Sequence, residues 1–120
     1  MANDYAYGKR KELQVGEFLQ RRGYEWGRAP GSRGAVDLVA KKGRQSLAIQ
    51  VKATRALSIS ATRLTPQEEE NLLSFTDGNT AIPVLALVSR NYVWLMRMPD
   101  GKELLKGNLK PLKYLYPDQT

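Results

Sequence analysis

The sequence predicts an α/β protein whose central mixed β-sheet is flanked by helices, with elements in the order α-β-β-β-α-β-β. Two segments combine helical spacing of apolar residues with suitable end residues. Several short runs rich in Val, Ile, Leu and aromatic residues, separated by turn residues, are typical of strands. A chain of 120 residues can form one modest core, so we expect a single domain over residues 1–120.

The first helix is predicted over residues 8–22. Gly23 is a suitable stop, and Arg21 and Arg22 lie in the expected last turn. The strands expected in this half of the chain cover residues 24–30, 35–41 and 45–54. The KKGR sequence joins the last two of these strands as a β-hairpin.

The second helix begins with several capping features. Thr65 is the N-cap, Pro66 takes the first helical position and Glu68 completes a capping box. The apolar side of this helix is expected to consist of Leu72, Leu73 and Phe75. Two further strands follow, over residues 81–89 and 92–98. From Glu103 onward no period indicates an element.

The residue types that the chain lacks exclude several kinds of chemistry. It contains no cysteine and no histidine, which excludes disulfides, thiolate or imidazole metal ligands, and Ser-His or Cys-His catalysis. No apolar run approaches the roughly 18 residues of a membrane span. The N-terminal residues also lack the apolar segment of a secretory signal, and we expect a cytoplasmic protein.

Positive charge is concentrated in the first half of the chain. Residues 1–63 hold 13 lysines and arginines against 5 acidic residues, a net charge of +8, whereas residues 64–120 hold 6 against 7. This asymmetry favours nucleic acid as a partner over a basic surface that serves solubility alone. The basic residues expected to bind DNA are Lys9, Arg10, Lys11, Arg28, Arg33, Lys41, Lys42, Arg44, Arg55 and Arg63.

Polar side chains interrupt the apolar strands of the hairpin. Successive side chains of a strand point to opposite faces, so Gln50 and Lys52 share one face, and Asp37 joins them if the two strands pair. The opposite face is expected to be apolar, with Val36, Leu38 and Ala40 from one strand and Leu47, Ile49, Val51 and Ala53 from the next.

The first helix adds a second carboxylate. Its apolar face consists of Val15, Phe18 and Leu19, and Glu12 falls only about 20° from Leu19 on the helical wheel. Glu12 therefore points inward, whereas Glu17 is predicted on the opposite, polar side. A buried carboxylate needs a partner, which is either a metal ion or a nearby Lys or Arg.

Together, Glu12, Asp37 and the amide oxygen of Gln50 form an oxygen-rich set suited to Mg²⁺ or Mn²⁺. Lys52 would orient a water or stabilise charge that develops on a phosphate oxygen. Beneath a basic surface, this combination indicates metal-dependent hydrolysis of a phosphodiester.

These residues resemble the motif of the PD-(D/E)xK nuclease superfamily. In that pattern, an Asp on one strand is followed by an acidic-x-Lys triplet on the next strand of a hairpin. Asp37 and the triplet Gln50-Val51-Lys52 match it, with 12 residues between Asp37 and Gln50. The resemblance implies a restriction-endonuclease-like fold.

Within this superfamily the chain is most similar to the archaeal-type Holliday junction resolvases. The matching residues are Gly8 and Glu12 in the helix, Arg22-Gly23-Tyr24 at its end, and Arg28-Ala29-Pro30-Gly31-Ser32 before a loop. The likeness covers about residues 8–54 and continues loosely through the second helix and the strand at 81–88.

The resemblance implies a Mg²⁺-dependent endonuclease of DNA recombination and repair, with Mn²⁺ as a possible substitute. It also implies a homodimer acting on a four-way junction, because both have two-fold symmetry. By the same resemblance, Glu12 and Asp37 are metal ligands, Gln50 is a neutral ligand and Lys52 is the catalytic lysine. Ser32 would lie in a loop near the scissile phosphate.

Two positions depart from the family pattern. Gln50 replaces the usual acid, although Mrr-type restriction endonucleases also carry Gln there, and Val36 replaces a common Pro. An amide oxygen can ligate Mg²⁺ but brings no charge. Two alternatives therefore stay open: a restriction- or repair-type nuclease with another DNA substrate, or a non-catalytic DNA-binding module on the same fold. Trp26 and Trp94 are expected in the core or an interface rather than stacked on bases.

Overall fold

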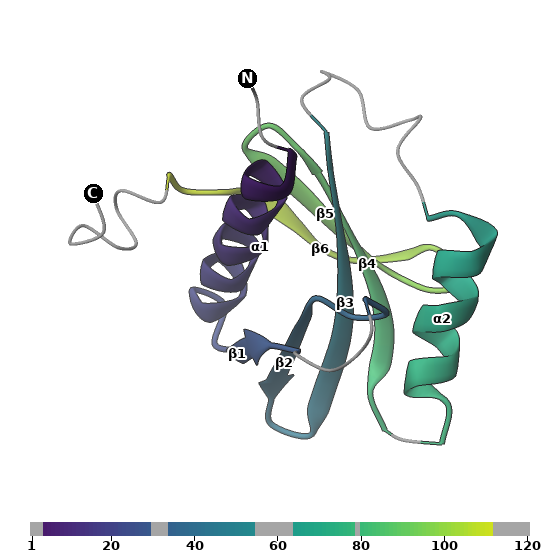
Figure 1. Ribbon diagram of the computed structural model, residues 1–120. Helices are drawn as coiled ribbons and strands as arrows, with labels where there is room; N and C mark the ends of the chain where they lie inside the picture. The colour runs from purple at the N-terminus through teal and green to yellow at the C-terminus, as the bar shows by residue number, and fades with distance from the viewer. Residues whose placement is uncertain (1–3, 30–33, 55–63, 79, 112–120) are drawn as a thin grey trace.

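The computed structural model describes residues 4–29, 34–54, 64–78 and 80–111. A six-stranded sheet lies between two helices, one on each face (Figure 1). The elements are α1 (Asp4–Gln20), β1 (Glu25–Arg28), β2 (Leu38–Lys42), β3 (Gln45–Thr54), α2 (Pro66–Thr76), β4 (Ile82–Ser89), β5 (Tyr92–Arg97) and β6 (Lys102–Asn108). The predicted α/β class with a mixed, helix-flanked sheet is confirmed, with one strand more than expected.

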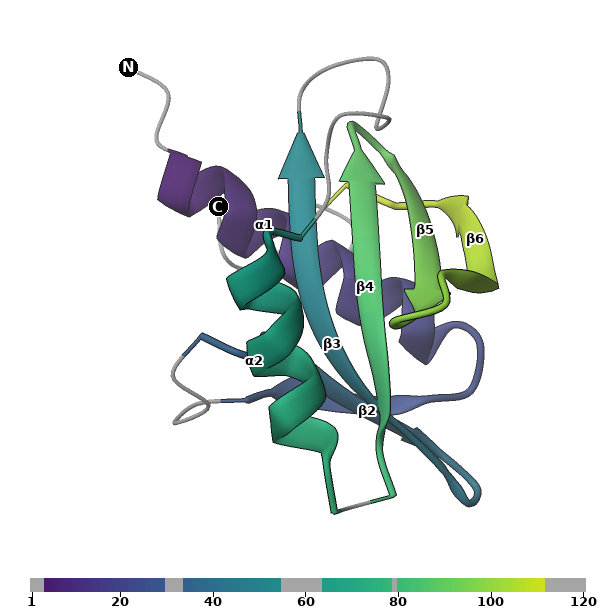
Figure 2. The ribbon, with the colours of Figure 1, turned by 90° about the vertical axis from the view of Figure 1, so that its right-hand side faces the viewer.

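The strands lie in the sheet in the same order as in the chain. Only β3 and β4 are parallel, and α2 connects them across one face of the sheet, as Figure 2 shows. All other neighbours are antiparallel. Because β4 is buried on both faces, its sequence is a nearly continuous apolar run instead of an alternating one.

Each face of the sheet has its own apolar core. The core under α1 contains the predicted helix residues Val15, Phe18 and Leu19, all fully buried. The core under α2 contains Leu72 from the helix, whereas Phe75 remains 39% exposed and Leu73 is half-buried. The predicted apolar side of α2 was therefore wrong for Phe75, because Leu72 and Thr76, one turn apart, define the buried side of the helix and Phe75 lies beside it.

The helix ends follow the local sequence closely. The Thr65 hydroxyl accepts the Glu68 N–H at 3.1 Å, and the Glu68 carboxylate accepts the Thr65 N–H at 2.9 Å, which confirms the capping box. Gly23 has a φ of 91°, as expected for a residue that stops a helix. However, α1 begins at Asp4 and ends at Gln20, so Arg21 and Arg22 lie in the turn beyond it.

The strand predicted over residues 35–41 starts only at Leu38. The chain bends at Asp37, and Val36 packs into the core under α2 while Leu38 packs under α1. The prediction that Val36 shares a face with Leu38 and Ala40 was therefore wrong. The bend breaks the two-residue alternation, and it does so at the residue that carries the first motif carboxylate.

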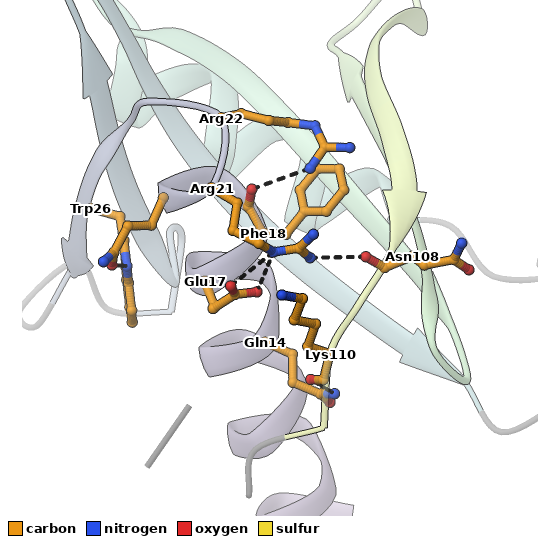
Figure 3. A network of polar contacts seen from close by, with 9 residues as sticks. Gln14, Glu17, Phe18, Arg21, Arg22, Trp26, Asn108 and Lys110 are labelled. Carbon is orange, nitrogen blue, oxygen red and sulfur yellow. Dashed lines mark hydrogen bonds and ion pairs between the residues drawn. The ribbon is translucent and has the colours of Figure 1, made fainter. Parts of the chain in front are cut away.

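Strand β6 was not predicted from the sequence. This edge strand pairs with β5 and contains Lys, Glu, Gly and Asn, which suit an edge but weaken a strand pattern. The chain at the end of β6 lies against α1, where Arg21 donates to the Asn108 carbonyl at 3.0 Å and Gln14 to the Lys110 carbonyl at 2.6 Å (Figure 3).

This packing covers part of the α1 side that was predicted to face solvent. Glu17 forms an ion pair with Arg21 at 2.8 Å, and its side chain is only 16% exposed. Trp26 (Figure 3) is half-buried: it packs on the same helix over Gly16, against the core under α1, and its indole N–H donates to the Gln20 side-chain oxygen. None of the helices in the described ranges is long and apolar enough to cross a membrane.

Candidate active site

The candidate site lies where β2 ends and β3 continues alone along that edge. Pairing between the two strands runs from Lys42 opposite Gln45 to Leu38 opposite Ile49, whereas β3 extends to Thr54. Beyond Ile49, the backbone of β3 therefore has no β2 partner. That edge of the sheet is therefore open beyond Ile49.

Asp37 fills the opening. Its backbone N–H donates to the Ile49 carbonyl at 2.8 Å, and its carbonyl accepts the Ala29 N–H at 3.1 Å. Its carboxylate accepts the Val51 N–H at 2.8 Å. The side chain thus replaces the strand hydrogen bond that β2 would have supplied, and three hydrogen bonds fix its position.

Glu12 reaches the site from α1. Its side chain is only 13% exposed, which agrees with the predicted inward orientation. Arg28 of β1 donates to it at 2.8 Å, and Lys9 lies 3.8 Å from the same oxygen. Of the two predicted partners for Glu12, a metal ion or a nearby Lys or Arg, the structure shows the basic side chains.

The two carboxylates influence one another. Burial raises the pKa of Glu12, and the negative charge of Asp37 raises it further, against the opposing effects of Lys9 and Arg28. Burial also raises the pKa of Asp37, although the hydrogen bond from Val51 opposes this shift. The surroundings of both acids thus disfavour their negative charges, a situation that an added cation would relieve.

Gln50 and Lys52 both lie on β3 and are half-buried. Since Val51 and Ala53 pack against the core under α1, strand alternation directs Gln50 and Lys52 toward α2. The Lys52 ammonium lies 2.5 Å from the Glu68 carboxylate of α2. Lys52 also lowers the pKa of Asp37 by its charge, so the lysine and the edge carboxylate are electrostatic neighbours.

These residues fit a divalent ion by the chemistry of their donors. Carboxylate and amide oxygens are the hard ligands that Mg²⁺ and Mn²⁺ prefer. Within the described ranges, no group of three or more His, Cys, Asp or Glu side chains is placed to hold a metal. With Gln50 in place of an acid, Glu12 and Asp37 are the charged donors, and the Gln50 oxygen would complete a three-residue set.

The predicted DNA-binding residues have different surroundings. Arg10 is exposed, and so are Lys41, Lys42 and Arg44 around the β2–β3 hairpin. Lys11 is a correction: it is only 8% exposed, and its ammonium donates to the Arg90 carbonyl at 2.6 Å. It ties α1 to the β4–β5 turn and does not contribute to a DNA-binding surface.

Four of the predicted residues lie outside the part of the chain that the structure describes: Ser32, Arg33, Arg55 and Arg63. Lys9 and Arg28, predicted to contact DNA, both pair with Glu12.

Trp94 is half-buried on β5, with its ring centroid 4.5 Å from that of Tyr92. The contact of Glu68 with Lys52 was not predicted from the sequence, because the capping box already accounted for Glu68.

Comparison with known proteins agrees with this fold. The model of the archaeal Holliday junction resolvase family, Hjc, matches residues 3–106. The fold is similar to the crystal structure of Hjc from Archaeoglobus fulgidus, a Holliday junction resolvase from an archaeal hyperthermophile, with a TM-score of 0.64. The two sequences are 26% identical, and the match covers 90% of this chain and 89% of the other.

Proposed function

The chain belongs to the archaeal Holliday junction resolvase family and is a nuclease that resolves such junctions, and from this premise we propose how its residues cleave DNA. In this proposal residues 1–120 act as one nuclease domain. The observation that supports it is the Asp37 carboxylate at the open edge of β3, which accepts the Val51 N–H at 2.8 Å. The charge of Lys52 acts on this carboxylate, and the charge of Asp37 acts on Glu12.

Nucleases of this family generally use a divalent metal, and the donors here suit Mg²⁺, with Mn²⁺ as a substitute. Glu12, Asp37 and the amide oxygen of Gln50 would hold the ion. When bound, it would polarise the scissile phosphate and lower the pKa of a coordinated water. Asp37 is already oriented for this role by the Val51 N–H, so little rearrangement of that side chain is needed.

Lys52 would act as the cationic donor at the reacting phosphate. An ammonium has three N–H donors, and the contact with Glu68 uses one of them. The others can donate to the attacking water or to a phosphate oxygen, where negative charge develops in the transition state. Gln50 brings no charge, so the site has two carboxylates for the ion and should hold it more weakly than a site with three.

The substrate in this proposal is branched DNA, with the four-way junction preferred. Exposed cations around the hairpin, together with Arg10, would contact phosphates. A junction has two-fold symmetry, and a homodimer would place two equal sites on opposing strands. Binding should weaken as salt is added: log K should fall linearly with the logarithm of the salt concentration, with a slope of about 0.9 for each phosphate neutralised.

The test is cleavage of labelled four-way junction, duplex and single-stranded DNA of matched sequence, with Mg²⁺, with Ca²⁺ and with a chelator. We expect paired incisions in the junction with Mg²⁺, and binding without turnover in Ca²⁺. Cleavage that persists in the chelator would contradict the metal assignment. Preferred cleavage of duplex would favour a restriction- or repair-type substrate instead.

The alternative that the sequence left open is a non-catalytic DNA-binding module. Gln50 is the feature that favours it, whereas membership of a nuclease family favours cleavage. In that case the protein binds junctions but cuts none of the three substrates in Mg²⁺ or Mn²⁺. Gain of cleavage in Gln50→Glu would then show that only the missing charge separates this chain from an active nuclease.

A further inference from the structure

Glu68 contacts the candidate site from the first turn of α2. One carboxylate oxygen lies 2.5 Å from the Lys52 ammonium, and the other accepts the Thr65 N–H at 2.9 Å. We propose that Glu68 is a positioning residue that holds the Lys52 ammonium in place for the cleavage step. This inference rests on the proposed function, in which Lys52 acts at the scissile phosphate.

Lys52 needs such a partner because of its side-chain chemistry. An ammonium on a four-carbon stem has many rotamers and no fixed direction. The contact with Glu68 is a short, charge-assisted hydrogen bond. The side chains of Lys52 and Glu68 are 29% and 33% exposed, so the pair is partly shielded from water and less screened than a surface pair.

Glu68 is itself well anchored. The capping box fixes the start of α2, and Leu72, one turn later, is fully buried in the core under the helix. Burial alone would raise the pKa of Glu68, but hydrogen bonds from Lys52 and from the Thr65 backbone outweigh it and lower the pKa. The carboxylate is therefore ionised at neutral pH and offers Lys52 a fixed negative charge.

Glu68 has two roles: it accepts the Thr65 N–H in the capping box, and it accepts a hydrogen bond from Lys52. The substitution Glu68→Gln separates them. A capping box accepts Gln in place of Glu, so the amide oxygen can keep the Thr65 N–H. The amide nitrogen is then the group that faces Lys52, and it is a donor, as is the ammonium. The substitution thus keeps the helix start and removes the acceptor for Lys52.

A matched control is Glu69→Gln. It makes the same charge change in the same turn of α2, but residue 69 is turned by about 100° around the helix from residue 68. Glu68→Asp is a second test variant, which keeps the charge at the helix start with a side chain too short to reach both partners. All variants are compared with wild type in thermal unfolding before activity is measured.

The experiment measures single-turnover cleavage of a four-way junction by the full chain in saturating Mg²⁺, together with junction affinity in Ca²⁺. We expect Glu68→Gln and Glu68→Asp to slow cleavage by roughly tenfold to a hundredfold, the scale of a misplaced catalytic group. Junction affinity should stay within about twofold of wild type, because neither substitution changes a residue that is proposed to contact DNA. Glu69→Gln should cleave within about twofold of wild type.

A second readout follows Lys52 directly. In ¹⁵N-resolved spectra of the lysine ammonium groups, the Lys52 signal should be protected from exchange in wild type and in Glu69→Gln, and lost in Glu68→Gln. Slow cleavage with an unchanged Lys52 signal would overturn the inference, because the defect would then not act through the lysine.

The variant Lys52→Ala separates this inference from the proposed function. If Lys52→Ala is inactive while both Glu68 variants cleave at the wild-type rate, Glu68 has no positioning role but Lys52 keeps its assignment. If Lys52→Ala cleaves as fast as wild type, the assignment of Lys52 fails and the role of Glu68 fails with it.

Discussion

Replacing Asp37 with asparagine should make the protein more stable while it removes cleavage. The asparagine oxygen can still accept the Val51 N–H, and the volume hardly changes. The raised pKa of Asp37, caused first by burial, means that its surroundings disfavour the charged form. Because a raised pKa means that the folded protein disfavours the charge, removal of this charge should raise the free energy of unfolding.

The assay is thermal unfolding in the presence of a chelator, where each 1 kcal/mol gained corresponds to roughly 3–6 °C in Tm for a chain of this length. A carboxyl group whose folded pKa is raised costs stability above that pKa, and the cost disappears as the pH falls through it. The advantage of Asp37→Asn over wild type should therefore be full at pH 7 and shrink toward pH 4.

Asp100→Asn is the control with the opposite sign. The hydrogen bond from Arg97 lowers the pKa of the exposed Asp100 carboxyl group, so its surroundings favour the charge. This variant should be slightly less stable than wild type at pH 7. If Asp37→Asn instead loses stability at pH 7, or keeps its full gain at pH 4, the account of a strained buried charge is wrong.

Three further predictions concern the site and its helix. Glu12→Gln should abolish junction cleavage in a gel assay, whereas Glu17→Gln should retain it, since Glu17 bridges to Arg21 away from the site; inactivity of Glu17→Gln would reverse the assignment of the two. Gln50→Glu should shift half-maximal cleavage to lower Mg²⁺, by about tenfold for each 1.4 kcal/mol gained, and an unchanged Mg²⁺ profile would remove Gln50 from the ligand set. Gly16→Ala should lower the free energy of unfolding by about 1–3 kcal/mol, because its Cβ would lie 2.5 Å from the Trp26 ring; Gly8→Ala, whose Cβ meets nothing within 4 Å, should add about 0.5–1 kcal/mol, and equal urea midpoints for the two would contradict the packing argument.

Local chemistry explains the features that the sequence predicted well. The capping box of α2 involves Thr65 and Glu68, which are three residues apart, and the stop at Gly23 depends on one backbone angle. Such features need no knowledge of distant parts of the chain. The inward orientation of Glu12 also follows from a single helix, because its apolar neighbours define which side is buried.

Features that depend on distant segments could not be predicted in this way. Lys11 was expected to bind DNA and Glu17 to face solvent. However, the β4–β5 turn covers Lys11, and Arg21, held by the last residue of β6, covers Glu17. The polar residues of α1 do not indicate these partners, because a long cationic side chain can donate hydrogen bonds either to water or to a buried carbonyl. The edge strand β6 is itself stabilised by pairing with β5 rather than by its own residue preferences.

The position of the site depends on where a strand stops, which explains why its motif could be recognised while its geometry could not. If β2 continued to residue 35 as predicted, its backbone would bond to the Val51 N–H, and the Asp37 carboxylate could not. The bend at Asp37 leaves that N–H for the side chain and opens the edge of β3. At this edge the charge of Asp37 acts on Glu12, which comes from α1 on one face of the sheet, and the charge of Lys52, on the other face, acts on Asp37. The loss of strand pairing is offset by three hydrogen bonds to a single residue, and the result is a polar site within an otherwise apolar sheet.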